Sequence, residues 1–298
     1  MLFRSKGVVW AKDTPNFIAN RIGVYSMLYV IRSMLDLGLS IEAVDKLTGP
    51  VIGHPKSASF RTADLVGLDT LLHVAENVYE GAPEDEKREM FQPPELVQKM
   101  LEKKLLGEKT KQGFYKKSKD EEGKKVILSI DPETLEYTPQ EKVKFASLEA
   151  ASNASGAGNK VKALFYADDK AGEFTFRQIS ETLIYSANRI PEIADDIVNV
   201  DNAMKWGFAW KMGPFEAWDA LGLAKSVEKM KAAGYDIPGW VQEMLGQGNE
   251  AFYKTEAGKT SYYDPMSKAY QEVPVKPGII LLPALKDRDM TVAENKGA

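Results

Sequence analysis

The chain has 298 residues, of which 44% are hydrophobic and 28% charged, proportions typical of a globular protein. Its formal net charge of -4 argues against nucleic-acid binding, because nucleic-acid binders usually carry a basic excess. The absence of cysteine excludes disulfides, thiolate nucleophiles and cysteine-bound metals. The two histidines, His54 and His73, lack the spacing of a metal site, so no metal is expected. His73 has apolar neighbours and is expected in the core or at an interface.

No targeting segment or membrane span is evident in the sequence. No apolar run approaches the ~20 residues needed to cross a bilayer. Residues 1–6 carry charges, but no apolar stretch of signal-peptide length follows them. The lack of cysteine also fits a reducing compartment. We therefore expect no membrane span and a cytoplasmic location.

Hydrophobic periodicity and turn residues predict a mainly helical first half. Residues 6–12 form a short β-prone run, which Asp13-Thr14-Pro15 ends. The helix expected over residues 17–37 is apolar on nearly every face, as in a central helix or one shared between subunits. Gly38 ends this helix, and Ser40 can cap the next one. Further helices are expected over residues 41–47, 63–79 and 94–104.

The rest of the chain alternates between loops, short β-like runs and a second helical block. The expected order is a basic, glycine-flanked loop at 107–113, a β-like run at 125–130, a connector at 151–162, a helical block at 174–245 and a tail of weak β character from 262 onward.

Short motifs of the first half recur in the second half in the same order. The pairs are Val44-Asp45 and Val200-Asp201, Asp64-x-x-Gly67-Leu68 and Asp219-x-x-Gly222-Leu223, Pro94-x-x-Val97-Gln98 and Pro238-x-x-Val241-Gln242, Phe114-Tyr115 and Phe252-Tyr253, and Asp131-Pro132 and Asp264-Pro265. The separation of the partners falls steadily, from 156 residues (45 to 201) to 155, 144, 138 and 133, as deletions in a second copy would produce. Asn20 has no partner, because Asn188 in a similar segment lies 168 residues away (20 to 188).

A repeated helical unit has a physical explanation. A helix as apolar as residues 17–37 must bury several faces, and one small helical unit covers few of them. Pairing in a twofold homodimer is the usual solution. Two copies on one chain replace subunit binding by an intramolecular contact. The alternative is a tandem structural duplication without a function of its own.

Three further segments carry a family resemblance. Residues 13–21 read Asp-Thr-Pro-Asn-Phe-Ile-Ala-Asn-Arg, residues 109–115 read Lys-Thr-Lys-Gln-Gly-Phe-Tyr, and residues 211–223 read Lys-Met-Gly-Pro-Phe-Glu-Ala-Trp-Asp-Ala-Leu-Gly-Leu. In this order they resemble three motifs of the C-terminal domain of 3-hydroxyacyl-CoA dehydrogenases. Asn16 departs from the family's glycine, and His54-Pro55-Lys56-Ser57 stands where the family often has Met-Gly-Pro-Phe.

The resemblance implies a mainly α fold: two tandem helical domains packed as a pseudo-dimer, with minor β structure in the connector and tail. Multifunctional β-oxidation proteins of this family carry such duplications. The expected division is residues 1–12 as a remnant of the last strand of a Rossmann domain, 13–117 as the first helical domain, 118–170 as a connector with short β segments, 171–250 as the second helical domain and 251–298 as an extended tail.

The family also implies an N-terminal Rossmann domain that binds NAD and carries a catalytic His-Glu pair. The sequence contains no Gly-x-Gly-x-x-Gly, and neither histidine has the family's catalytic context. We therefore expect a fragment with no catalytic residue and no cofactor of its own, in which NAD is bound by the absent Rossmann domain.

The resemblance assigns one residue to the substrate. The asparagine that matches Asn20 lies beside the acyl substrate and the catalytic histidine in the family, although an asparagine one turn into a helix often bonds only local backbone. Lys109 and Lys111 could contact the phosphates of CoA, or could belong to a solvated loop. Asp64 and Asp219 are expected to position helices, because no base accompanies them. Tryptophans are expected to fill the core where the copies meet; these are Trp206, Trp210 and Trp218.

The expected function is therefore a part of an L-3-hydroxyacyl-CoA dehydrogenase of fatty-acid β-oxidation, inactive alone, which forms one wall of the acyl site. Its expected partners are the acyl-CoA substrate, the missing Rossmann domain and an enoyl-CoA hydratase domain in the same polypeptide. One alternative is a non-catalytic helical assembly module of a multifunctional β-oxidation protein. Another is the helical domain of a 6-phosphogluconate dehydrogenase-like enzyme, against which the motifs at 15–21 and 212–222 argue.

Overall fold

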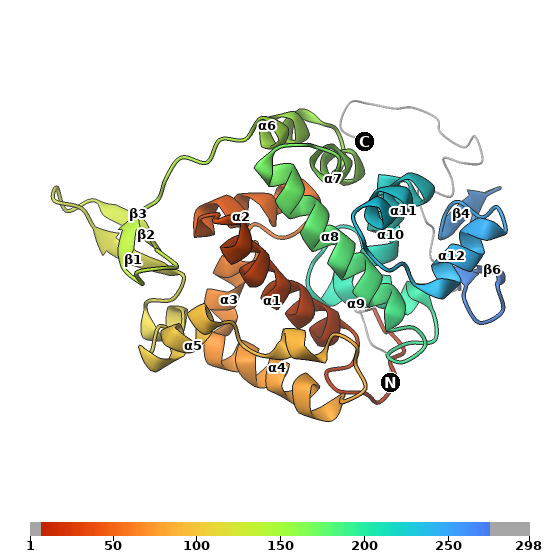
Figure 1. Ribbon diagram of the computed structural model, residues 1–298, viewed down its shortest axis with the longest axis horizontal. Coiled ribbons are helices and arrows are strands. Elements are labelled where there is room, and N and C mark those ends of the chain that lie inside the picture. The colour runs from red at the N-terminus through yellow and green to blue at the C-terminus, as the bar shows by residue number, and fades with distance from the viewer. Residues whose placement is uncertain (1–6, 275–298) are drawn as a thin grey trace.

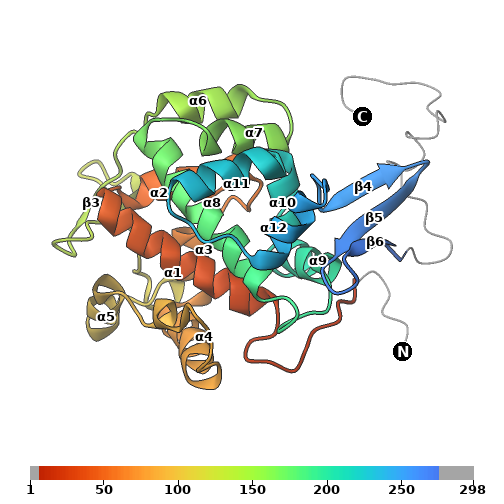
Figure 2. The same cartoon turned by 45° about the vertical axis from the view of Figure 1, so that its right-hand side comes forward.

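Two long helices form the centre of the molecule in the computed structural model, which describes residues 7–274 (Figures 1 and 2). Helix α1 (Ala19–Leu37) opens the first half of the chain, and α8 (Lys170–Asn188) opens the second. They pack antiparallel, because Arg21 contacts Tyr185 while Tyr25, one turn later, contacts Glu181, one turn earlier. The helix predicted over residues 17–37 is confirmed as α1, whose apolar faces contact α8, α4 and α9.

Each long helix is followed by the same order of elements. In the first half these are α2 (Ile41–Leu47), α3 (Phe60–Val66), α4 (Leu68–Gly81), α5 (Glu95–Glu102), β1 (Tyr115–Lys119), β2 (Lys125–Ile130) and β3 (Tyr137–Pro139). In the second half they are α9 (Ile197–Gly207), α10 (Pro214–Leu221), α11 (Leu223–Ala232), α12 (Gly239–Gly246), β4 (Tyr253–Glu256), β5 (Lys259–Asp264) and β6 (Ala269–Glu272). The first half has three additional 3-10 turns, η1 (Pro50–Ile52), η2 (Arg88–Phe91) and η3 (Glu108–Thr110). The predictions of a mainly helical fold and of minor β structure are confirmed.

One aspartate in each half makes corresponding hydrogen bonds. Asp45 on α2 accepts the backbone N–H groups of Phe60 and Arg61, at 2.7 and 3.1 Å, and the Tyr115 hydroxyl at 2.8 Å. Asp201 on α9 accepts the N–H groups of Phe215 and Glu216, at 2.9 and 3.1 Å, and the Tyr253 hydroxyl at 2.9 Å. In both halves the carboxylate therefore ties the second helix to the third helix and to the first strand of the sheet.

A second pair of aspartates repeats in the same way. Asp64 accepts the N–H groups of Phe114 and Tyr115, and Asp219 accepts those of Phe252 and Tyr253, all at 2.8–2.9 Å. Burial raises the pKa of each carboxyl to about 6, although both N–H donors act in the opposite direction. These contacts are the helix-positioning role that the sequence suggests for the two aspartates.

Glycine and serine set the helix ends in the first half. Gly38, with φ 56°, ends α1, and the Ser40 hydroxyl accepts the Ala43 N–H and so caps α2. The single helix predicted over residues 63–79 is wrong, because Gly67 at φ 95° separates α3 from α4. A left-handed φ at this position breaks the helical hydrogen-bonding pattern and is cheap only for glycine.

The prediction of a connector over residues 151–162 is also wrong, because this segment is largely helical. It holds the end of α6 (Ala146–Asn153) and most of α7 (Ala157–Phe165). The Ser, Asn and Gly content of residues 151–162 does not indicate a helix. The helical spacing is set by three buried apolar residues of α7, Val161, Leu164 and Phe165. Helix α7 thereby packs on η1, α8 and α10 and bridges the two halves.

The predicted strand remnant at the N-terminus is not found where the chain is described. Residues 7–12 form no strand, and residues 1–6 lie outside the described residues. Instead, the Trp10 N–H donates to Asn199 Oδ1 at 2.7 Å and the Lys12 N–H to the Ile193 carbonyl at 2.9 Å. This segment therefore runs along the second half without a neighbouring strand to pair with.

The structure also differs from the sequence predictions in the tail and at His73. The extended tail predicted over residues 251–298 contains β4–β6, and residues 275–298 lie outside the described residues. His73 is exposed on α4, so it is not a core histidine. Across residues 7–274, no helix combines the length and the apolar character needed to cross a bilayer.

Candidate functional site

The segment that enters α1 has an unusual backbone. Asn16 and Phe17 have φ values of 63° and 52°, in the left-handed region that glycine adopts at least cost. Asparagine tolerates this region better than most residues, and Asn16 Nδ2 also donates to the Val74 carbonyl at 2.6 Å. Asn16 can therefore hold this left-handed turn, although the resembled motif has glycine at this position.

Neighbouring residues in the first turn of α1 face opposite environments. Asn20 is exposed, and its side chain makes no hydrogen bond to any residue between 7 and 274. Arg21, the next residue, is fully buried at 0% exposure. The first turn thus presents a free amide outward while its guanidinium neighbour is fixed inside.

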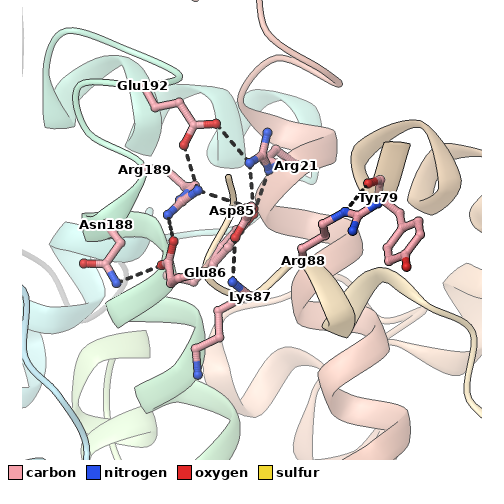
Figure 3. A network of polar contacts seen from close by, with 10 residues as sticks. Arg21, Tyr79, Asp85, Glu86, Lys87, Arg88, Asn188, Arg189 and Glu192 are labelled. Atoms are coloured by element: carbon pink, nitrogen blue, oxygen red, sulfur yellow. Dashed lines mark hydrogen bonds and ion pairs between the residues drawn. The ribbon is translucent and has the colours of Figure 1, made fainter. Parts of the chain in front are cut away.

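A network of polar side chains that joins the two halves holds Arg21 (Figure 3). Arg21 Nη2 donates to Asp85 Oδ2 at 2.6 Å and to Glu192 Oε1 at 3.0 Å. Arg21 Nε donates to the Tyr185 hydroxyl at 2.7 Å. Arg189 completes the network, with Nη1 3.3 Å from Asp85 Oδ2 and 2.7 Å from Glu192 Oε2. Glu86 and Asn188 extend it towards the surface.

Burial and charge have opposing effects on this network. Burial alone would raise the pKa of Asp85, but the Tyr185 hydrogen bond and the Arg189 charge outweigh it and lower the pKa. Burial alone would lower the pKa of Arg21, but Tyr185, Asp85 and Glu192 raise it overall. Both groups are therefore charged at neutral pH, which fixes the start of α1 against α8.

Exposed apolar side chains lie on the segments next to the first turn of α1 and at the end of α9. Trp10 is 77% exposed, Phe17 57% and Trp206 54%. Phe17 lies just before Asn20 in the chain, and the backbone of Gly207 packs close to the Ala19 side chain, which brings the end of α9 and Trp206 beside the first turn of α1. An amide beside an apolar surface can bind a carbonyl or hydroxyl oxygen and cover an aliphatic chain. Trp206 is thus wrongly predicted as a core residue, whereas Trp218 is fully buried.

The two lysines expected at CoA phosphates lie in different environments. Lys109 forms an ion pair with Asp69. Lys111 lines a cavity of about 680 Å³ between α2, η3 and the first sheet. Asn20 does not line this cavity, and α1, whose 19 residues span about 28 Å, separates Asn20 from α2. The structure does not bring Asn20 and the two lysines into one site.

The sequence interpretation missed the charged network behind Asn20. Its members come from distant parts of the chain, and the apolar pattern over residues 17–37 does not indicate a charged network. A buried arginine requires an acidic partner, so Arg21 within an otherwise apolar helix was the available signal. Nothing local in the sequence identified Asp85 as that partner.

The described residues do not fit a dinucleotide or a metal. Both sheets are antiparallel, with strand orders β1-β2-β3 and β4-β5-β6. NAD binds at the carboxyl ends of parallel strands, beside a glycine-rich turn. No parallel sheet occurs within residues 7–274, so none of these residues is assigned to NAD. The same part of the chain holds no group of three or more His, Asp or Glu side chains placed to share a metal ion.

Part of the chain is similar to a known family of domains. Residues 17–117 match the family model of the 3-hydroxyacyl-CoA dehydrogenase C-terminal domain. A crystal structure of 3-hydroxybutyryl-CoA dehydrogenase from Escherichia coli has a similar fold, with a TM-score of 0.50 and 16% identity over 81% of this chain and 62% of that one.

Two curated relatives extend the match beyond this domain. A probable 3-hydroxyacyl-CoA dehydrogenase of Bacillus subtilis is 53% identical over 293 residues, which cover 98% of this chain and 36% of the relative. A putative fatty acid oxidation complex trifunctional enzyme of Rickettsia felis is 32% identical over 212 residues, 71% of this chain and 28% of the relative. The chain thus spans about a third of the length of these relatives.

Proposed function

We propose that this chain is the substrate-facing helical part of an NAD-dependent L-3-hydroxyacyl-CoA dehydrogenase of fatty-acid β-oxidation. The intact enzyme would oxidise a 3-hydroxyacyl-CoA to the 3-ketoacyl-CoA, with NAD bound by a Rossmann domain outside these 298 residues. The observation that carries the proposal is the free Asn20 amide on a turn whose neighbour, Arg21, is fixed by a buried ionic network. The family match over residues 17–117 and the names of the relatives support it.

Asn20 would hold the reacting oxygen of the substrate. Its amide N–H can donate to a 3-keto or 3-hydroxyl oxygen, and the exposed Phe17 and Trp206 would cover the acyl chain. A rigid helix start matters because a small displacement of a positioning group lowers the rate strongly. A group of the Rossmann domain would take the proton, and its bound NAD would accept the hydride.

We also propose that the two halves are copies of one helical unit, packed as a pseudo-dimer, divided at residues 13–117 and 171–250. The repeated element order and the matching bonds of Asp45 and Asp201 support this division. The ring of Tyr25 on α1 stacks on that of Tyr185 on α8, with centroids 3.8 Å apart, as expected at the centre of such a pair. The extensive contact between halves favours an assembly role as the second candidate function.

The context of the intact protein is proposed as well. The trifunctional names of the Rickettsia relatives favour a multifunctional polypeptide, in which an enoyl-CoA hydratase domain would be a neighbour. A cytoplasmic location is expected for such an enzyme.

Acyl-CoA binding by the 298-residue chain tests the role of Asn20. We expect Asn20→Ala to weaken acetoacetyl-CoA binding, measured by isothermal titration calorimetry, by about tenfold, the effect of one lost hydrogen bond. Asn153→Ala removes another exposed amide, on α6, and should leave binding unchanged. Equal affinity of the Asn20→Ala and Asn153→Ala chains would remove Asn20 from the site. NADH-dependent reduction of acetoacetyl-CoA by the chain alone would contradict its proposed dependence on a Rossmann domain.

A further inference from the structure

The cavity between α2, η3 and the first sheet has an excess of cationic side chains, although the chain as a whole is acidic. Its lining contains five cations and three carboxylates. The cations are Lys46, Lys56, Arg61, Lys111 and Lys117. The carboxylates are Glu42, Asp45 and Glu108.

Hydrogen bonds and ion pairs from the protein already engage the three carboxylates. Glu42 accepts the Glu141 N–H at 2.8 Å. Asp45 accepts three N–H groups and the Tyr115 hydroxyl. Glu108 binds both Arg61 and Lys117.

Three lysines of the lining remain without an acidic partner. Lys46, Lys56 and Lys111 form no ion pair with any residue between 7 and 274. Lys111 also has φ 62°, a left-handed conformation that is unfavourable for a lysine relative to a helical or extended one. The cavity therefore offers three lysine side chains that no carboxylate of the described residues neutralises.

The second half shows that the scaffold does not require three of the five cations, Lys46, Arg61 and Lys117. The hydrogen bonds of Asp45 and Asp201 define equivalent positions in the two halves. Arg61 and Glu216 are equivalent, because the N–H group of each donates to the aspartate of its own half. By the same bonds, Lys46 follows Asp45 where Asn202 follows Asp201. Lys117 lies two residues after Tyr115, where Thr255 lies after Tyr253. Three cations thus correspond to one acidic and two neutral residues.

The lining of the cavity also includes apolar side chains. Ile127 on β2 is 55% exposed and lines the cavity together with Pro50. An isoleucine left accessible beside a cationic cluster suits a ligand with one apolar face and one anionic end. The volume of about 680 Å³ lies in the range of small-molecule and cofactor sites.

We propose that this cavity binds a nucleoside polyphosphate. Its phosphates would face Lys46, Lys56 and Lys111, and its base would lie against Ile127 and Pro50. The same adenosine phosphate group occurs in free nucleotides and at the end of coenzyme A, so both are sources of this chemistry. The site lies at the opposite end of α1 from Asn20 and does not depend on the role proposed for that residue.

Calorimetric titration of the 298-residue chain with ATP, without metal and at low ionic strength, tests the site. We expect saturable binding that Lys46→Gln/Lys111→Gln weakens at least about tenfold, because each lysine forms a charge-assisted contact. Lys103→Gln/Lys162→Gln removes the same charge from two exposed lysines outside the lining and should have little effect. Lys46→Arg/Lys111→Arg keeps the charge and should retain binding.

Further titrations separate the two ends and the two sources of the ligand. Ile127→Ala should weaken ATP but not inorganic tripolyphosphate, which has no base. Coenzyme A binding that depends on Lys46 and Lys111, without ATP binding, would support coenzyme A as the source. The proposal is overturned if neither compound binds saturably, or if both bind the Lys46→Gln/Lys111→Gln chain as tightly as the unchanged one. Asn20→Ala should leave ATP affinity unchanged, so this result stays separate from the acyl-CoA test.

Discussion

His54 shows how the packing of the two halves changes one side chain. Its imidazole stacks on the Trp210 ring, with centroids 4.1 Å apart, and the Gly53 carbonyl accepts the Lys211 N–H. Burial lowers the pKa of His54 to about 3, while a hydrogen bond involving the Thr48 backbone has a smaller, opposite effect. The side chain is therefore neutral in the folded protein at physiological pH.

We predict that His54 does not titrate between pH 5 and 8. Because an unfolded histidine has a pKa of about 6.5 and the folded one is lower, the stability contributed by neutral His54 is complete above pH 6.5 and falls as the pH decreases towards 3. Between pH 7 and 5 the loss should be about 1–2 kcal/mol. NMR titration of the imidazole protons measures the pKa directly, and His73→Gln assigns the signals because the chain has two histidines. A His54 midpoint near pH 6.5 would contradict the prediction.

Among single residues, the sequence predicted those whose role depends on local chain geometry. Asp64 and Asp219, each followed three residues later by a glycine, were expected to position helices, and both bind the backbone of the first strand of a sheet. Partners far apart in the chain could not be predicted. Arg21 and Asp85 are 64 residues apart, and no local pattern connects them.

At the scale of elements, the buried ionic network fixes how α1 meets α8 and the loop before η2. Its two arginines come from different halves, and both lie beside Asp85. Removing one partner of a buried ion pair is costly, because the remaining charge stays desolvated. The network therefore favours one relative position of the two long helices.

Arg21→Met should lower the free energy of unfolding by about 3 kcal/mol. The reason is that the buried Asp85 carboxylate would keep only one of its two arginine partners, Arg189. Arg177→Met is the control on α8: it breaks an exposed (i, i+4) pair with Glu173 and should cost about 0.5 kcal/mol or less. Because the pKa of Asp85 is lowered in the folded protein, its contribution is present above pH 4 and is lost at lower pH. Urea denaturation at pH 7 and at pH 3 measures both effects. Equal losses in the two variants at pH 7 would show that the network contributes no more than a surface pair.

Element prediction succeeded where apolar spacing and capping residues agreed. Residues 41–47, capped by Ser40, form a helix with these bounds, and the β-like run at 125–130 is strand β2. It failed where composition obscured the spacing, as in α7, and where one glycine divided a continuous apolar pattern, as at Gly67. The strand expected at the N-terminus has β-prone residues but no partner strand within the described chain. A strand requires such a partner for its hydrogen bonds.

At the scale of the molecule, the two halves bury each other's most apolar surfaces. Helices α1 and α8 cover one another, α7 fills the space between η1 and α10, and Trp210 reaches across to His54. Tyr25 and Tyr185 would each be exposed if the halves separated. An isolated half would therefore expose a large apolar face, which favours cooperative folding of both halves.

The position of the tryptophans allows this cooperativity to be tested. All five lie outside residues 13–117, and Trp218 is buried within the second half. Phe114 is buried against Phe60 in the first half, which contains no tryptophan between residues 13 and 117. Phe114→Ala should lower the free energy of unfolding by about 3–5 kcal/mol. If both halves unfold together, urea midpoints from tryptophan fluorescence and from far-ultraviolet circular dichroism fall equally. Phe252→Ala, at the matching position of the second half, should give the same coincident shift. A Phe114→Ala chain that unfolds in two steps, with its tryptophan transition unmoved, would show that the halves are independent domains joined only by the chain.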